Sequence, residues 1–147
     1  MKIDSLNLCL KISQAHASLN LKLDTELGTL HGLSMSDFIL LYLLSRAENG
    51  RMAVADLVRP MGVQLSAVTR QLVLLEKTGR LQREPELGSD GKRYVAIRPA
   101  GKKLLNEALA TTAETICREV ARELPADSLA ALDSALTTIC ETNALKV

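Results

Sequence analysis

Residues 52–79 read MAVADLVRPMGVQLSAVTRQLVLLEKTG, and residues 80–98 continue RLQREPELGSDGKRYVAIR. In the first segment, apolar residues recur three and four positions apart in two runs, 53–61 and 64–78, which is the spacing of amphipathic helices. Gly62 separates the runs, and Gly79 follows the second as a helix-ending residue does. Two short helices around a glycine turn predict a helix-turn-helix, the unit that lays its second helix in the major groove of DNA.

The outward side of the second predicted helix carries residues that can recognise base edges. Arg70 can bind guanine with two hydrogen bonds, and Gln64 can bind adenine. The methyl groups of Thr69 or Leu65 can contact the thymine methyl group, and Ser66 lies in the same first turns. This face is therefore the predicted base-reading surface.

Two short strands, residues 81–86 and 93–98, are predicted directly after this helix, with an Asp-Gly reversal signal in the turn 88–91. Lys92 and Arg93 lie beside the turn, and a cation at a hairpin tip suits the narrow, strongly negative minor groove. A helix-turn-helix pattern alone is a weak signal, because any two packed helices can share a glycine turn. The hairpin that follows favours a winged helix-turn-helix.

Charge is segregated along the chain. The whole sequence has a net charge of only +1, but residues 51–103 hold 11 Lys or Arg against 5 Asp or Glu, and the remainder holds 7 against 12. Basic side chains that neutralise phosphates release counterions and supply most non-specific affinity for DNA. A merely solvated basic face would not be expected to coincide with the predicted motif.

Length and composition fit one ordinary domain. The chain has 147 residues, 47% of them apolar and 2% aromatic, so its core must be largely aliphatic. No run has the length of a membrane span and the start has no signal-peptide character, so we expect a cytoplasmic protein without membrane contact. Three cysteines without close pairing, and two distant histidines, predict reduced thiols and no metal or other cofactor.

Helices are predicted on both sides of the motif. Residues 3–30 carry two apolar stripes, 34–37 form a capping box before a helix at 38–47, and helices follow from Pro99 to about 123 and from Pro125 to about 144. The fold class is therefore mainly α with a small β-hairpin wing, in a single chain that spans residues 1–147. Residues 35–98 are expected to form the DNA-binding region, and 1–34 with 99–147 a helical dimerisation region.

The sequence resembles the MarR family of bacterial transcriptional regulators over nearly its whole length. The resemblance is carried by Met61-Gly-Val63, Ser66-Ala-Val-Thr-Arg70, Leu75-Glu-Lys-Thr-Gly79, Arg83 and Ile97-Arg-Pro-Ala-Gly101. It implies a homodimer that binds a pseudo-palindromic operator, usually represses nearby genes including its own, and is released by a small molecule or an oxidant. It also implies that Ser66, Thr69, Arg70 and Arg83 contact DNA, with Asp90 and Lys92 or Arg93 in the wing.

Three positions depart from the family pattern. Gln64 replaces the usual Ser or Thr before the recognition helix, and a poorer cap costs about 1 kcal/mol. Asp90-Gly-Lys92 replaces Asp-x-Arg, with Arg93 one step further, so the sequence leaves open which cation enters the minor groove. Gln71 faces the predicted core, where it is expected to weaken helix packing slightly.

Two triggers for release are considered. A small-molecule cleft is expected near His16, Phe38 and Tyr42, as the resemblance implies, although nothing in the sequence names its ligand. Cys9 lies near the position of the reactive cysteine in the peroxide-sensing branch of the family, but that branch's tyrosines are missing here. A buried core cysteine is the more ordinary interpretation, and cysteine oxidation is the second-ranked trigger.

Two other classes of function were weighed. The sequence lacks the glycine-rich phosphate loops, the zinc-protease motif and the nucleophile elbow that would indicate an enzyme, so we expect none. The stronger alternative is a winged-helix protein-interaction or antirepressor module without specific DNA binding. Gln64, Leu65 and Ala67 favour that alternative, because they make the recognition helix less polar, whereas Thr69, Arg70 and the charge asymmetry oppose it.

Overall fold

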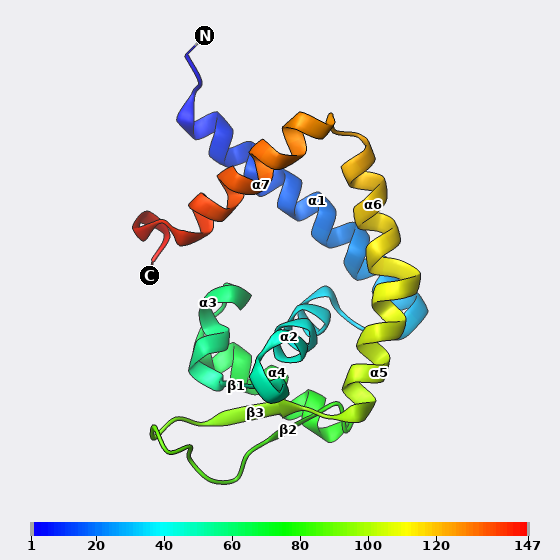
Figure 1. Cartoon of the computed structure of the whole chain (residues 1–147), viewed down its shortest axis with the longest axis vertical. Coiled ribbons are helices and arrows are strands. Elements are labelled where there is room, and N and C mark those ends of the chain that lie inside the picture. The colour runs from blue at the N-terminus through cyan, green and yellow to red at the C-terminus, as the bar shows by residue number, and fades with distance from the viewer. Residues whose placement is uncertain (1, 147) are drawn as a thin grey trace. The chain divides into compact units, whose positions relative to one another are not determined.

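A computed structural model describes residues 2–146, so Met1 and Val147, the outermost residues of the predicted dimerisation region, lie outside the described part. The chain divides into two compact units, Met1–Ala113 and Glu114–Val147. Among the described residues, the first unit holds five α-helices, a three-stranded sheet and a π-helical segment, and Figure 1 shows the sheet beside α4. The fold is mainly helical with a small sheet, as the sequence predicts.

The first two helices begin at side-chain caps. In α1 (Ser5–His31), the carboxylate of Asp4 accepts a hydrogen bond from the Leu6 amide at 3.1 Å. In α2 (Met35–Arg46), the Ser34 hydroxyl oxygen accepts from the Asp37 amide at 2.9 Å, which confirms the predicted start of this helix. Each cap satisfies a backbone donor that the helix itself cannot pair. The α2 helix lies in the core, with three leucines fully buried: Leu40, Leu41 and Leu44.

The sheet contains one strand more than predicted. Strands β2 (Leu81–Arg83) and β3 (Tyr94–Ile97) form the expected hairpin, and β1 (Arg51–Ala53) pairs with the other edge of β3, giving the antiparallel order β1-β3-β2. In the register, Met52 lies opposite Val95, and Gln82 lies opposite Ala96. The central strand therefore joins the wing to the segment that begins the helix-turn-helix.

The predicted helix at 53–61 was wrong in its first half. Ala53 belongs to β1, η2 (Val54–Leu57) is a 3-10 helix, and only α3 (Val58–Met61) is α-helical. The Val54 amide donates to the Arg93 carbonyl oxygen at 2.8 Å. Hydrogen bonding beside β3 therefore sets the backbone at the start of this segment, although its apolar spacing favours an α-helix.

The helix-turn-helix is confirmed. Gly62 ends α3 with φ +66°, a left-handed conformation that glycine adopts without strain. Then α4 (Leu65–Lys77) buries Val68, Leu72 and Leu75 on one side, at the spacing that the sequence predicts. The structure thus leaves the opposite side of α4 outward.

The predicted long helix after the wing is divided into segments. In the first unit, α5 (Pro99–Ala108) passes into a π-helical segment, η3 (Leu109–Ala113). There the Nε2 atom of His31 lies 2.9 Å from the hydroxyl oxygens of both Thr111 and Thr112, of which Thr112 is 3% exposed. These contacts tie the end of α1 to the π-helical segment.

The second unit is a pair of helices. It contains α6 (Glu114–Arg122) and α7 (Ala126–Glu141), followed by a short 3-10 turn, η4 (Asn143–Leu145). Pro125 immediately precedes α7, close to the predicted start of that helix. None of the residues of α7 is buried in the single chain.

Among residues 2–146, no single helix is both long enough and apolar enough to cross a bilayer. Helices α1 and α2 reach the required length and composition only when taken together, across a bend of 83°.

Replacing Gly101 with alanine is expected to destabilise the protein. The added carbon would meet the Arg80 carbonyl oxygen at 2.1 Å, and backbone cannot move aside as a flexible side chain can. We expect the free energy of unfolding to fall by about 1–3 kcal/mol.

The matched control is Gly28→Ala in α1, where the added carbon would lie 3.8 Å from the Leu33 carbonyl oxygen, an ordinary contact. Alanine there is expected to stabilise the helix by about 0.5–1 kcal/mol. Urea unfolding followed by circular dichroism measures both variants. A Gly101→Ala midpoint equal to that of the wild type would contradict the close approach of α5 to Arg80.

Candidate nucleic-acid interface

The outward side of α4 and the residue before it present polar groups, several of which have no bonding partner among residues 2–146. Gln64, Leu65, Ser66, Thr69 and Arg70 are all exposed. Within residues 2–146, the side chains of Gln64, Ser66 and Arg70 make no hydrogen bond or ion pair, and Gln64 precedes the helix without capping it, as expected. The Thr69 hydroxyl donates to the Leu65 carbonyl oxygen at 3.0 Å. All five predicted residues of this helix therefore lie on one accessible face.

Gln71 has a different role from the expected one. Its amide Nε2 donates to the Ser36 hydroxyl oxygen at 3.1 Å and to the Asp37 carboxylate at 2.9 Å. The expectation that it weakens helix packing was wrong, because both partners lie in the first turn of α2. Gln71 thus holds α4 against the start of α2 through two hydrogen bonds.

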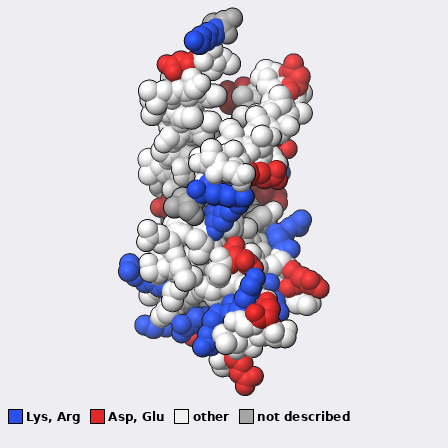
Figure 2. Space-filling view, turned by 90° about the vertical axis from the view of Figure 1, so that its left-hand side faces the viewer, with Lys and Arg blue, Asp and Glu red and all other residues white. Residues whose placement is uncertain are grey.

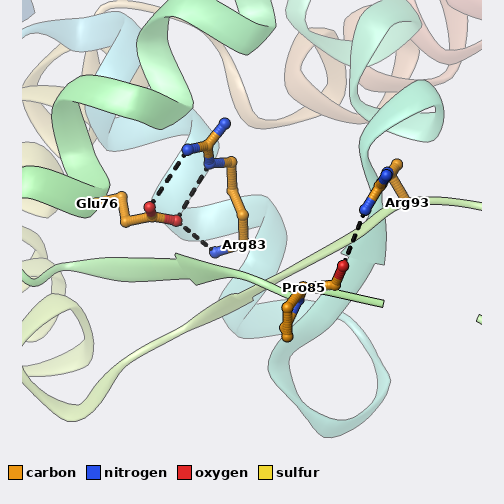
Figure 3. A network of polar contacts seen from close by, with 4 residues as sticks. All are labelled: Glu76, Arg83, Pro85 and Arg93. Atoms are coloured by element: carbon orange, nitrogen blue, oxygen red, sulfur yellow. Dashed lines mark hydrogen bonds and ion pairs between the residues drawn. The ribbon is translucent and has the colours of Figure 1, made fainter. Parts of the chain in front are cut away.

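Arg83 is bound to the recognition helix. Its Nε atom donates to the Glu76 carboxylate at 3.1 Å, its second guanidinium nitrogen at 3.3 Å, and its backbone amide at 2.8 Å (Figure 3). These bonds lower the pKa of Glu76, the side-chain hydrogen bond from Arg83 being the largest cause. Arg83 remains 43% exposed, but its first structural role is to fasten β2 to α4.

Tyr94 is the first residue of β3 and directly follows the wing, residues 84–93. The Arg51 guanidinium carbon lies 3.8 Å from the centre of the Tyr94 ring, a cation–π distance. Arg51 also donates to both carboxylate oxygens of Glu84, at 2.8 and 2.9 Å. On the other side, the Tyr94 hydroxyl donates to Asp90, whose second oxygen accepts from the Lys92 amide at 3.0 Å. A connected polar network therefore runs from β1 to the tip of the wing.

This network shifts several pKa values through hydrogen bonds. Arg51 lowers the pKa of Glu84 and Glu84 raises that of Arg51. The hydrogen bond from Tyr94, followed by that from the Lys92 amide, lowers the pKa of Asp90. The same bond raises the pKa of Tyr94, because it stabilises the protonated phenol.

The two candidate wing cations have different partners. A guanidinium nitrogen of Arg93 donates to the Pro85 carbonyl oxygen at 3.0 Å and so joins the two arms of the wing (Figure 3). The ammonium group of Lys92 lies 4.0 Å from the Asp56 carboxylate, and both side chains are more than half exposed. Asp90 serves to shape the turn, since both of its oxygens accept hydrogen bonds within the wing.

A cleft of about 390 Å³ lies between α4 and the wing. Side chains of both charges and apolar side chains line it: Val54, Thr69, Leu72, Glu76, Arg83, Glu84, Pro85, Arg93 and Tyr94. Figure 2 shows Lys and Arg side chains gathered around the part of the first unit that holds the sheet and the wing. Asp and Glu side chains lie among them in the same view, and the basic segment 51–103 lies wholly within the first unit.

Comparison with solved structures identifies this arrangement. AbsC, a MarR family regulator from Streptomyces coelicolor, superposes with a TM-score of 0.79 at 23% identity, covering 96% of each chain. The fold is that of the MarR regulators. A MarR family regulator from Rhodococcus sp. RHA1 superposes with a TM-score of 0.81 at 16% identity, covering 96% of this chain and 97% of the other.

A third similar structure contains nucleic acid. Sco3205, another MarR family regulator from Streptomyces coelicolor, was solved in complex with DNA; it superposes with a TM-score of 0.79 at 17% identity, covering 96% of this chain and 89% of that one. No protein-family model matches the present sequence, and no curated protein is significantly similar to it. The MarR fold is therefore recognisable at low sequence identity.

The residues predicted for effector release lie on the first two helices of the MarR fold. Phe38 and Tyr42 stack, with ring centres 6.4 Å apart and an angle of 12° between the rings. His16 is exposed on α1, and Cys9, expected as a core residue, is exposed on the same helix. No group of three potential metal ligands occurs among residues 2–146. The effector pocket at His16, Phe38 and Tyr42 stays a prediction.

Sequence reasoning missed the residues that support the wing. Arg51 and Glu84 are far apart in sequence, and nothing indicated that β1 exists. Tyr94 was included only as a residue of the second strand. The one available signal was the close alternation of acidic and basic side chains in 83–93, which is too common on protein surfaces to indicate a network.

The hydrogen bonds of the wing are expected to weaken in acid. Because the pKa of Asp90 in the folded protein lies below the ordinary value of about 3.9, its contribution is complete above that value and is lost as the pH falls through the folded pKa. The measurement is a titration of the Lys92 amide resonance by NMR. Asp90→Asn is the control, and it should abolish the titration. A midpoint at or above the ordinary aspartate value would contradict the network.

Proposed function

We propose that this chain is a sequence-specific DNA-binding transcriptional regulator of the MarR type. The observation that carries the proposal is the outward face of α4, where Gln64, Ser66 and Arg70 are exposed without a partner in residues 2–146. Polar side chains that make no bond within the protein remain available to base edges and phosphates. The complex of Sco3205 with DNA supports the same use of this fold.

Individual roles follow from side-chain chemistry. Arg70 carries two parallel donors that match guanine, while Gln64 can both donate to and accept from adenine. The Thr69 hydroxyl proton is engaged by the Leu65 carbonyl, so the methyl group is the part of Thr69 that best suits a thymine contact. Ser66 and Arg83 are proposed to contact phosphates, and the wing with Asp90, Lys92 and Arg93 to enter the minor groove.

The regulator is proposed to act as a homodimer through residues 1–34 and 99–147. On α7, Leu129, Leu132 and Leu136 are 36–45% exposed at three- and four-residue spacing. Near the start of α1, Leu6 and Leu10 are 69% and 58% exposed. Apolar stripes of this kind are stabilised by burial against another helix, here that of a second copy. Two copies would bring two recognition helices to the half-sites of a pseudo-palindromic operator.

The dimer is proposed to be a cytoplasmic repressor without enzymatic activity. It would occupy an operator near its own gene and release it when a small molecule binds near His16, Phe38 and Tyr42. Oxidation of Cys9 is the second trigger, and its exposure on α1 makes the thiol accessible. Either event would act on α1, because His16 and Cys9 both lie on this helix, which also carries proposed dimer contacts.

A protein-interaction module is the alternative function. The observation that favours it is the apolar surface in and before α4, where Val63, Leu65 and Leu74 are 39%, 51% and 60% exposed. Such residues can dock on an apolar partner surface as well as on thymine methyl groups. The two functions differ in their dependence on Arg70.

Replacing Arg70 with alanine is expected to abolish specific binding to DNA from upstream of the protein's own gene. Loss of a bidentate guanine contact should weaken specific binding about 10- to 100-fold per site, while affinity for scrambled DNA changes little. Fluorescence anisotropy with scrambled competitor at two salt concentrations measures this change. Arg118→Ala in α6 removes the same charge outside the DNA-binding region 35–98; a variant that sedimentation shows to remain dimeric should bind as the wild type does. Equal losses in the two variants would contradict the assignment.

Replacing Leu132 with glutamate is expected to dissociate the dimer. Burying a carboxylate in an apolar helix contact on both copies should weaken self-association by roughly 100-fold or more. Sedimentation equilibrium measures the change, with Leu74→Glu as the control for an exposed leucine outside the proposed contact. Circular dichroism verifies that both variants fold. A wild-type chain that remains monomeric at about 10 µM would contradict the proposed dimer.

A further inference from the structure

The cations around the wing are not equally available to DNA. Arg51 is engaged by both oxygens of Glu84, and Arg83 by Glu76. Arg93 donates to the Pro85 carbonyl oxygen at 3.0 Å, across the two arms of the wing. If Arg93 extended into a groove, it would give up this bond, which is one of those that join the two arms. Arg93 is therefore better suited to closing the wing than to entering DNA.

Lys92 has the opposite character. Its side chain is 52% exposed, and its ammonium group approaches one carboxylate, that of Asp56, at 4.0 Å. A pair this long and this exposed contributes little, so a phosphate or a negative groove can replace Asp56 at small cost. Lys92 also directly follows Gly91, which has φ +78° in the turn at the tip of the wing. It is the better placed of the two cations to leave the protein surface.

The backbone of Lys92 is held in place although its side chain is accessible. Its amide donates to Asp90 at 3.0 Å, and its carbonyl oxygen accepts from the Gly88 amide at 2.8 Å. Asp90 in turn accepts from the Tyr94 hydroxyl. The Gly91 amide also donates to the Gly88 carbonyl oxygen at 2.9 Å. The turn that carries Lys92 is thus closed by four hydrogen bonds among the described residues, one of which comes from the side chain of Tyr94.

The Tyr94 ring is itself held on two sides. Arg51 lies over it at 3.8 Å, fixed by Glu84. Gly88 lies against its edge, where an added β-carbon would be 2.7 Å from a ring carbon and 2.9 Å from the Asp90 carboxylate. The turn therefore wraps closely around the ring, and its shape depends on the ring being there.

We infer that Lys92 is the cation which the wing inserts into the minor groove, and that Tyr94 is the positioning residue that holds it ready. This inference rests on the proposed DNA-binding function. Arg93 closes the wing, and Arg51 with Glu84 anchors the ring of Tyr94 to β1. An ordered wing loses less conformational freedom on binding than a flexible loop would, which strengthens the complex without adding a contact.

The test compares Lys92→Gln with Arg93→Gln, two adjacent changes that each remove one positive charge. The probe is a duplex enriched from a random pool by the wild-type protein, and the dissociation constant is measured as salt is varied. Lys92→Gln should lower the slope of log K against log salt by about one unit per wing, whereas Arg93→Gln should change it much less. The reverse order would overturn the inference while leaving the DNA-binding function intact. Failure of the wild type to enrich any duplex would overturn both.

Tyr94→Phe tests the positioning role without changing charge. It should weaken binding about 3- to 10-fold at unchanged salt slope, because Lys92 still reaches the DNA but must first be ordered. In the free protein, amide hydrogen exchange at Lys92 should be faster than in the wild type. If the variant keeps both the DNA affinity and the Lys92 amide exchange rate of the wild type, the role of Tyr94 is overturned. Both quantities are measured on folded protein, so a small loss of global stability does not imitate the expected result.

Asp56→Asn should have the opposite effect to Lys92→Gln. Removing the carboxylate that competes for Lys92 is expected to strengthen binding by up to about fivefold. Glu86→Gln, which removes an acidic charge from the wing itself, is the matched control and should strengthen binding less. An equal gain in both variants would show that only the summed charge matters, and would overturn the specific assignment to Lys92.

Discussion

The pairing of β3 with β1 on one edge and β2 on the other is the constraint on which the interface depends. Through β1, the sheet holds the segment that begins the helix-turn-helix, and through β2 it holds the strand that Arg83 fastens to α4. Recognition helix and wing therefore belong to one body within the first unit. A protein that contacts both grooves of duplex DNA needs its helix and its wing at a fixed separation, because the distance between the grooves is set by the DNA.

The charged side chains of this region serve two purposes. Arg51 and Arg83 are each paired with a carboxylate, and the four side chains of these two pairs are 32–43% exposed. Ion pairs this exposed add little to global stability, but they fix the local geometry. Arg70 makes no pair in residues 2–146, and Lys92 makes only a long one. The 11 Lys and Arg residues of segment 51–103 thus overstate the number of cations available to phosphates, because Arg51 and Arg83 are engaged by carboxylates of the same segment.

The sequence predicts the helix-turn-helix, the hairpin and the Ser34 cap, because each depends on a pattern among residues that are close together in sequence. It does not predict β1, whose three residues pair with β3 more than forty positions later. Gln71 looks like a defect in an apolar pattern until its partner Asp37, 34 residues earlier, is known. Likewise, Arg83 and Arg93 are correctly placed near the interface, but their partners Glu76 and Pro85 emerge only from the folded backbone.

Selection of binding sites from a random pool of duplex DNA tests the central claim most directly. Two copies of this fold, each presenting the outward face of α4, should enrich a sequence with two inverted half-sites about 10 base pairs apart, centre to centre. The enriched duplex should bind more tightly than scrambled DNA of equal length at physiological salt. A pool that remains random after repeated selection would contradict the claim that this chain recognises DNA sequence.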